Sequence, residues 1–154
     1  MSTFDKNLFL GQQTTEAGST EYTPIPINEL GYQAQIEKID ARQEQIKGET
    51  ATMLDVTYTI MDNDGSVEAA TGLKKNSVRQ TYFLDLSPNG GLDMGKGKNV
   101  QLNKLRDILG QNIQGKPWSP QMLVGQYIKV KVKHAPSEKE PGRLYTNIAE
   151  VSKL

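Results

Sequence analysis

Apolar and polar residues alternate along five short stretches of the chain, and this period of two predicts five β-strands. The clearest stretch runs from Leu54 to Ile60, where every second residue is apolar and the residues between them are Asp or Thr. In the first stretch the alternation shifts before Ile39, which predicts a β-bulge. The other four predicted strands span Tyr32–Ile39, Ser77–Leu86, Tyr127–His134 and Leu144–Val151.

The segments between the first three predicted strands carry turn and loop signals. Residues 41–49 are polar and contain Lys47-Gly48, so they predict a loop between the first two strands. Asp62–Gly65 reads Asp-Asn-Asp-Gly and predicts a hairpin turn. It also resembles part of a calcium-binding loop, but Ile60 and Thr71 would then occupy the first and last ligand positions, and neither supplies a carboxylate.

A helical segment is predicted between the third and fourth strands. After the glycine-rich stretch Ser87–Lys98, Asn99 is placed to cap a helix over Val100–Leu109, and Gly110 ends that helix. Ser119-Pro120 predicts a further short helical turn, because proline suits the first helical position. The order is therefore three strands, a helical insert and two strands.

This order predicts a mainly β protein: a five-stranded OB-fold barrel with a helical insert between strands three and four. An SH3-like barrel or a small sandwich shares the period-two strands, but the placement of the helix favours the OB-fold. Residues 1–24 are rich in Ser, Thr, Gly and Gln, with a small apolar island, and predict an N-terminal arm. Residues 25–154 form the predicted domain, with Tyr58 and Tyr82 in its core.

Composition excludes several kinds of chemistry. The chain has no cysteine and a single histidine, His134, which we interpret as a barrel-end or core residue. Thiolate catalysis, soft-ligand metal sites and Ser-His-Asp arrangements are therefore excluded. We expect a protein that is not an enzyme, with no catalytic residues, no metal and no cofactor. No apolar run is long enough to span a bilayer and no secretory signal is evident, so we expect a cytoplasmic protein without membrane partners.

The charge of the chain is divided between its two halves. The net charge is zero, but residues 1–70 carry four Lys or Arg against twelve Asp or Glu, whereas residues 71–154 carry fourteen against six. Such asymmetry is typical of a surface for nucleic acid or an acidic partner. Mutual neutralisation of the two halves within one fold is the alternative.

The densest basic cluster lies on the fourth predicted strand. Lys129, Lys131 and Lys133 alternate with apolar residues there, so one face of this strand is buried and the other shows a row of ammonium groups. A solvated strand face that prevents aggregation is the alternative. Single-stranded nucleic acid binds where a cationic groove lies beside aromatic rings on which bases stack. The candidate nucleic-acid-binding residues are Lys74, Lys75, Arg79, Phe83, Lys96, Lys98, Trp118, Tyr127, Lys129, Lys131 and Lys133.

Two stretches of the chain carry a resemblance to a known family. They read RQTYFLDLSPNGGLDMGKGKNVQLNKLRDILGQN and WSPQMLVGQYIKVKVKHAPSEKEPGRLYTNIAEVSKL. They are similar to the small OB-fold single-stranded DNA-binding proteins of bacteriophages, over about residues 25–154. The resemblance implies that Arg79 and Phe83, together with Lys129, Lys131 and Lys133, contact DNA. The chain departs from the bacterial family in ending at Val151–Leu154 without an acidic tail, so the resemblance does not indicate how it recruits a partner.

These features together predict a sequence-independent binder of single-stranded DNA in phage replication or recombination. Its expected partners are single-stranded DNA and phage replication or recombination proteins, in the cytoplasm of an infected host cell, and a homo-oligomer is compatible with this function. The alternative is a structural or protein-interaction OB module that does not bind nucleic acid, in which the N-terminal apolar island mediates oligomerisation.

Overall fold

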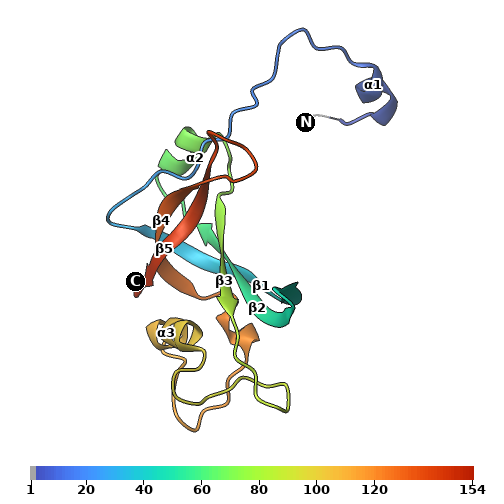
Figure 1. Ribbon diagram of the computed structural model, residues 1–154. Coiled ribbons are helices and arrows are strands. Elements are labelled where there is room, and N and C mark those ends of the chain that lie inside the picture. The colour runs from blue at the N-terminus through green and yellow to red at the C-terminus, as the bar shows by residue number, and fades with distance from the viewer. Residues whose placement is uncertain (1–2) are drawn as a thin grey trace.

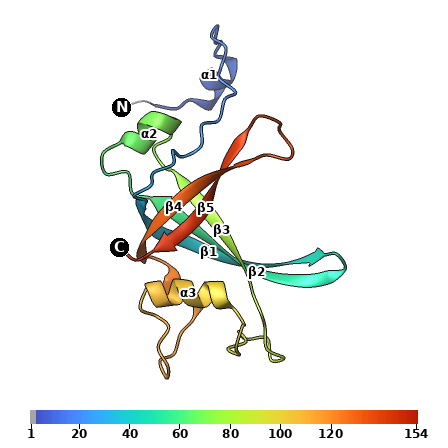
Figure 2. The same ribbon diagram turned by 60° about the vertical axis from the view of Figure 1, so that its left-hand side comes forward.

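A computed structural model describes residues 3–154 and contains one antiparallel sheet of five strands (Figures 1 and 2). Alternating residues with one apolar face form these strands, as the sequence predicts. The strands are β1 (Tyr32–Ile46), β2 (Glu49–Ile60), β3 (Ser77–Phe83), β4 (Tyr127–Pro136) and β5 (Leu144–Ser152).

The strand order across the sheet is β3-β2-β1-β4-β5. β1 is the central strand because it pairs with β2 along most of its length and with β4 through residues 32–35. β3 and β5 are the two edges, and no ladder joins them in residues 3–154, so the sheet is open. The protein is thus mainly β, as expected.

The core lies on the concave side of the sheet and consists of the inward residues of all five strands. Ile36 and Ile128 are completely buried there, together with Leu105 of the helix α3 (Val100–Ile108). Tyr58 and Tyr82 are also buried, which confirms the sequence prediction. Their hydroxyl oxygens lie 3.0 Å apart. Because burial disfavours a phenolate, the pKa of both tyrosines is raised above its ordinary value.

The β1–β2 hairpin is longer than predicted. Residues 41–49, expected to form a loop, instead extend both strands to a two-residue turn at Lys47-Gly48. Both turn residues have positive φ angles, 51° and 81°, as a type I′ hairpin turn requires. The sequence did not predict this extension, because the hairpin projects beyond the core and both of its faces are largely exposed, so no apolar alternation marks its strands. Cross-strand hydrogen bonds from Gln43 to Thr52 and from Gln45 to Thr50 join it, at 2.9 and 2.7 Å.

The prediction of a hairpin turn at Asp62–Gly65 was wrong. This turn leads into a short helix, α2 (Ser66–Thr71), which lies between β2 and β3. The Asp62 carboxylate accepts hydrogen bonds from the backbone N–H groups of Val67 and Glu68, at 3.0 and 2.8 Å. These bonds satisfy first-turn donors that have no partner within the helix.

The third strand ends at Phe83, three residues before the predicted end, and the glycine-rich loop that follows is held by Asn99. The predicted helix-capping role of Asn99 was wrong, because its side chain makes no hydrogen bond to α3. Instead, its amide donates to the backbone carbonyls of Asp85 and Asp93 and accepts from the N–H of Asp85. A buried amide in this position fixes the loop rather than the helix.

The helical insert is present where the sequence predicts it. α3 ends one residue before the predicted Leu109, and a 3-10 turn, η1 (Pro120–Leu123), begins after Ser119. No helix within residues 3–154 is long and apolar enough to cross a membrane. His134 lies half-buried near the end of β4, where its Nε2 is 2.7 Å from the carbonyl oxygen of Ile25.

The N-terminal arm carries a one-and-a-half-turn helix, α1 (Lys6–Gly11), that lies away from the sheet (Figures 1 and 2). None of the α1 residues is buried. The arm joins the domain at the β4–β5 hairpin, where the Arg143 guanidinium lies 4.8 Å from the ring centre of Tyr22. The backbone N–H of Ile25 also donates to the hydroxyl of Thr146 at 2.9 Å.

Candidate nucleic-acid interface

The side of the sheet that faces away from the core, here called the outer face, runs over β3, β2, β1 and β4. The register aligns Ser77, Thr59 and Gln35 of the first three strands with Tyr127 of β4. Because alternate residues share a face, all the outward candidates of β3 and β4 belong to this surface. They are Arg79, Phe83, Tyr127, Lys129, Lys131 and Lys133.

Phe83 is the prominent apolar group of the outer face. Its side chain lies at the end of β3 and is 64% exposed, although phenylalanine usually packs inside a protein. Its register partner on β2 is Met53, which is only 2% exposed. Tyr127, at the β4 end of the face, is 49% exposed. Two aromatic rings are therefore available to a flat ligand on this side of the sheet.

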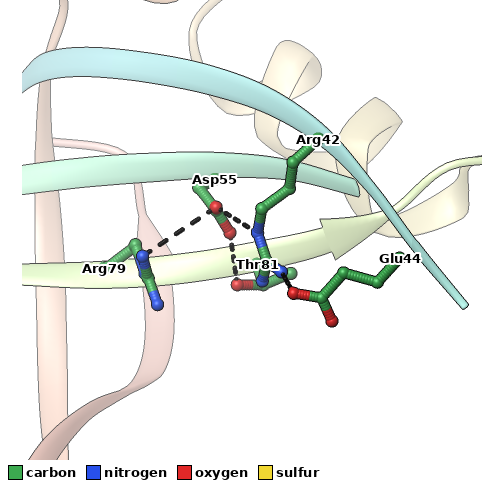
Figure 3. A network of polar contacts seen from close by, with 5 residues as sticks. All are labelled: Arg42, Glu44, Asp55, Arg79 and Thr81. Carbon is green, nitrogen blue, oxygen red and sulfur yellow. Dashed lines mark hydrogen bonds and ion pairs between the residues drawn. The ribbon is translucent and has the colours of Figure 1, made fainter. Parts of the chain in front are cut away.

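An ion-pair network around Asp55 occupies the middle of the outer face (Figure 3). Asp55 is 4% exposed, and its carboxylate accepts from Arg42 Nε at 2.7 Å and from the Thr81 hydroxyl at 2.6 Å. Arg79 Nη1 lies 3.9 Å from the same carboxylate, and Arg42 also pairs with Glu44. The network orients both guanidinium groups, while the Arg79 side chain stays 63% exposed.

The network also determines the ionisation of Asp55. Burial alone would raise the pKa of this carboxyl, but the hydrogen bonds from Arg42 and Thr81 favour the charged form, so its pKa is lowered. The carboxylate is thus ionised throughout the neutral range and neutralises part of the basic charge on the outer face.

We expect that the free energy of unfolding of Asp55→Asn depends less on pH in the acid range than that of the unmodified protein. Since the folded-state pKa lies below the unfolded value of about 3.9, the carboxylate stabilises the fold above that pH and loses this effect as the pH falls through the folded pKa. At pH 7 the variant should be less stable by about 1.5–3 kcal/mol, the range for hydrogen bonds to charged groups. Urea denaturation from pH 7 to pH 2.5 measures both effects. Asp107→Asn, at an exposed position on α3, is the control. The expectation would be contradicted if the free energy of unfolding of Asp55→Asn fell with decreasing pH as steeply as that of the unmodified protein.

The lysine row, Lys129, Lys131 and Lys133, extends the outer face along β4. None of the ion pairs found in residues 3–154 includes these lysines, although Glu150 of β5 is the register partner of Lys131. The stem of Lys129 lies against Gly31, where an added Cβ would be 2.9 Å from Lys129 Cγ. The glycine therefore permits this lysine to lie close to the backbone at the β1–β4 junction.

The remaining basic candidates lie at the margins of this face or beyond it. Lys74 and Lys75 precede β3, and Lys75 is paired with Glu37 on β1. Lys96 and Lys98 are exposed in the loop before α3. The predicted set is thus brought together only in part. The residues of β3 and β4 share the outward side of the sheet but are separated by β2 and β1, and the loop lysines lie apart from them.

Trp118 lies in the helical insert rather than on the outer face. Its ring is half-buried under the guanidinium of Arg106, 4.2 Å from the ring centre, and its indole N–H donates to Gln111 Oε1 at 2.9 Å. These contacts give the tryptophan a structural role at α3.

Sequence reasoning missed two cations of the outer face, Lys38 and Arg42. Arg42 fell in the segment predicted as a loop, and Lys38 follows the β1 bulge at which the register shifts. Lys38 pairs in register with Thr57, which also pairs with Arg79. To find Arg42, the sequence analysis would have had to recognise a strand that is exposed on both faces; to find Lys38, it would have had to place the bulge before this residue.

No cluster of metal-ligating side chains is present in residues 3–154. The arrangement therefore offers cations, aromatic rings and hydrogen-bond donors on an open sheet face. No protein-family model matches the chain, and no curated protein matches its sequence.

Proposed function

We propose that this protein binds single-stranded DNA without sequence preference through the outer face. The observation that carries the proposal is the lysine row, which takes part in no ion pair within residues 3–154 and lies on the same side of the sheet as two exposed aromatic residues, Phe83 and Tyr127. Tyr127 directly precedes the row on β4, whereas Phe83 lies at the far end of β3, in register with Met53 and Arg42. Ammonium groups neutralise phosphates, and exposed rings stack on bases of any identity.

The strand order supports assignment of the fold to the OB class. The OB-fold is a partly open five-stranded barrel that binds oligonucleotides on strands two and three and on the loops that flank them. Here the corresponding surface carries Arg79, Phe83 and the network of Asp55. The long β1–β2 hairpin and the β4–β5 hairpin would flank the bound strand (Figure 2).

A role in phage replication or recombination completes the proposal. It rests on the resemblance of residues 79–112 and 118–154 to phage single-stranded DNA-binding proteins. Binding without sequence preference would protect an exposed strand and keep it extended for a polymerase or recombinase. In this proposal the protein is not an enzyme, and it acts in the cytoplasm of the infected host cell.

The salt dependence of binding tests the proposal. If three lysines neutralise three phosphates, the slope of log K against log salt should be about −2, since each contact on a single strand contributes about −0.7. Fluorescence anisotropy of labelled oligo-dT at 20 to 300 mM salt measures this slope, with duplex DNA and RNA of equal length as comparisons. The absence of binding to oligo-dT at the lowest salt would overturn the proposal.

The second candidate function is a protein-interaction module that does not bind nucleic acid. The exposed apolar residues of α1 favour it, because a helix that buries none of its residues in its own domain is suited to a partner. The oligo-dT titration separates the two functions, since only the first requires affinity for DNA.

A further inference from the structure

A pocket of about 730 Å³ lies beside the helical insert, on the side of the domain away from α1. One wall is the inward side of the β1–β2 hairpin, and the others are the loop after β3 and the segment before η1. Its lining is mainly apolar and includes Leu84, Leu86, Leu92, Met94, Trp118 and Pro120. A pocket with such a lining suits large apolar side chains.

The pocket also contains a buried cation, the guanidinium of Arg106. Arg106 is 6% exposed, and none of the ion pairs in residues 3–154 includes it. Its hydrogen bonds to the Gln111 carbonyl and to Asn103 are long, at 3.3 and 3.4 Å, and its Nε finds no hydrogen-bond partner in the described part of the chain. Lys116 adds a second positive charge to the lining. Buried charges in proteins are normally paired, so this site favours an occupant with carboxylates.

The N-terminal arm has the complementary properties. Phe4, Leu8, Phe9 and Leu10 are 57–75% exposed, and α1 buries no residue in its own domain. Residues 3–24 carry three carboxylates, Asp5, Glu16 and Glu21, against one lysine. The arm thus combines apolar side chains with a negative charge, whereas the pocket combines apolar walls with unpaired positive charge.

The position of the arm favours a pocket on another copy of the chain. The arm is held at Tyr22 by Arg143 of the β4–β5 hairpin, and both views place α1 and α3 at opposite ends of the domain (Figures 1 and 2). Residues 12–21 span at most about 35 Å when extended. The ten residues of β4 alone cover about 33 Å, and the pocket lies farther along β1 at Gln43.

We propose that α1 of one copy docks into the Arg106–Trp118 pocket of a second copy. The apolar side chains of α1 fill the pocket, and the carboxylates of the arm form ion pairs with Arg106. Reciprocal exchange of two arms would give a closed twofold dimer, in which each copy is donor and acceptor.

Trp118 provides a direct readout, because it is the only tryptophan in the chain and it lines the pocket. We expect its emission to shift as the full-length chain is concentrated, in parallel with dimer mass from sedimentation velocity. If the emission of Trp118 is the same at every concentration, the arm does not dock into the pocket of a second copy, and the proposed exchange is overturned. Monomeric mass at all concentrations would also overturn it.

Two variants and a matched control identify the contact. The arm variant Leu8→Ser with Phe9→Ser, and the pocket variant Met94→Glu, should each weaken dimerisation at least about tenfold. Met94 Sδ lies 3.8 Å from Arg106 Nη1, so a glutamate there would neutralise this cation and repel the arm. Leu30→Ser removes an equally exposed apolar residue elsewhere and should leave the dimer unchanged.

Mixing the two variants provides the sharpest test. Each is expected to be monomeric alone, but the mixture retains one intact arm and one intact pocket and should form a heterodimer through a single contact. A peptide of residues 3–16 should likewise shift the Trp118 emission of the arm variant and not that of the pocket variant. Failure of both the mixture and the peptide to associate would refute the proposed contact. None of these outcomes depends on binding to DNA.

Discussion

The variant with both Lys129→Glu and Lys131→Glu is expected to lose binding to oligo-dT by at least about 100-fold while remaining folded. Two ammonium groups that would face phosphates become carboxylates, and juxtaposed like charges cost several kcal/mol. The fold should tolerate both changes because the two side chains point outward, whereas Ile128, Val130 and Val132 fill the core. Anisotropy at low salt measures the affinity, and urea denaturation measures the stability.

A charge-matched control separates the lysine row from general electrostatic attraction. Lys6→Glu with Lys104→Glu changes the net charge by the same amount, at exposed positions on α1 and α3 that lie off the outer face. This control should retain most of its affinity, with a modest loss from weaker long-range attraction. If the lysine-row variant bound as tightly as the control, the row would have no part in binding.

Phe83→Leu is expected to weaken binding of oligo-dT by about 1–3 kcal/mol, the usual contribution of stacking one base on an aromatic side chain. This corresponds to roughly a 5- to 150-fold loss. Phe83 is 64% exposed at the end of an edge strand, so the stability of the domain should hardly change.

The conservative variant Phe83→Trp distinguishes stacking from simple apolar contact. A larger ring should keep or increase the affinity, whereas leucine retains apolar volume without a flat face. Equal affinity of the leucine and tryptophan variants would exclude stacking at this position. The anisotropy assay for the lysine variants applies without change.

Local sequence pattern was sufficient wherever one side of an element is buried. The alternation on β2 and β4 predicted which residues enter the core, and the turn signals at Gly110 and Ser119-Pro120 located the helical insert. The lysine row also follows from alternation, because a strand with one buried face must expose the other. The expected DNA contacts remain a prediction.

Pattern failed where an element is exposed on both sides or where a polar group bonds at a distance. The outer half of the β1–β2 hairpin has no apolar face, so its strands looked like a loop. Asn99 precedes a helix as a capping residue would, yet its amide bonds to the loop of Asp85 and Asp93. Neither outcome is encoded in neighbouring residues.

The sequence by itself determined the mainly β character, the position of the helix and the separation of charge between the halves of the chain. These properties depend on residues close together in the chain, through periodicity and turn chemistry. Only the tertiary structure decided that Asp55 joins Arg42, Thr81 and Arg79, and that Arg106 is buried with no carboxylate partner among residues 3–154. Ion pairing and burial depend on segments far apart in sequence, which become neighbours only when the sheet forms.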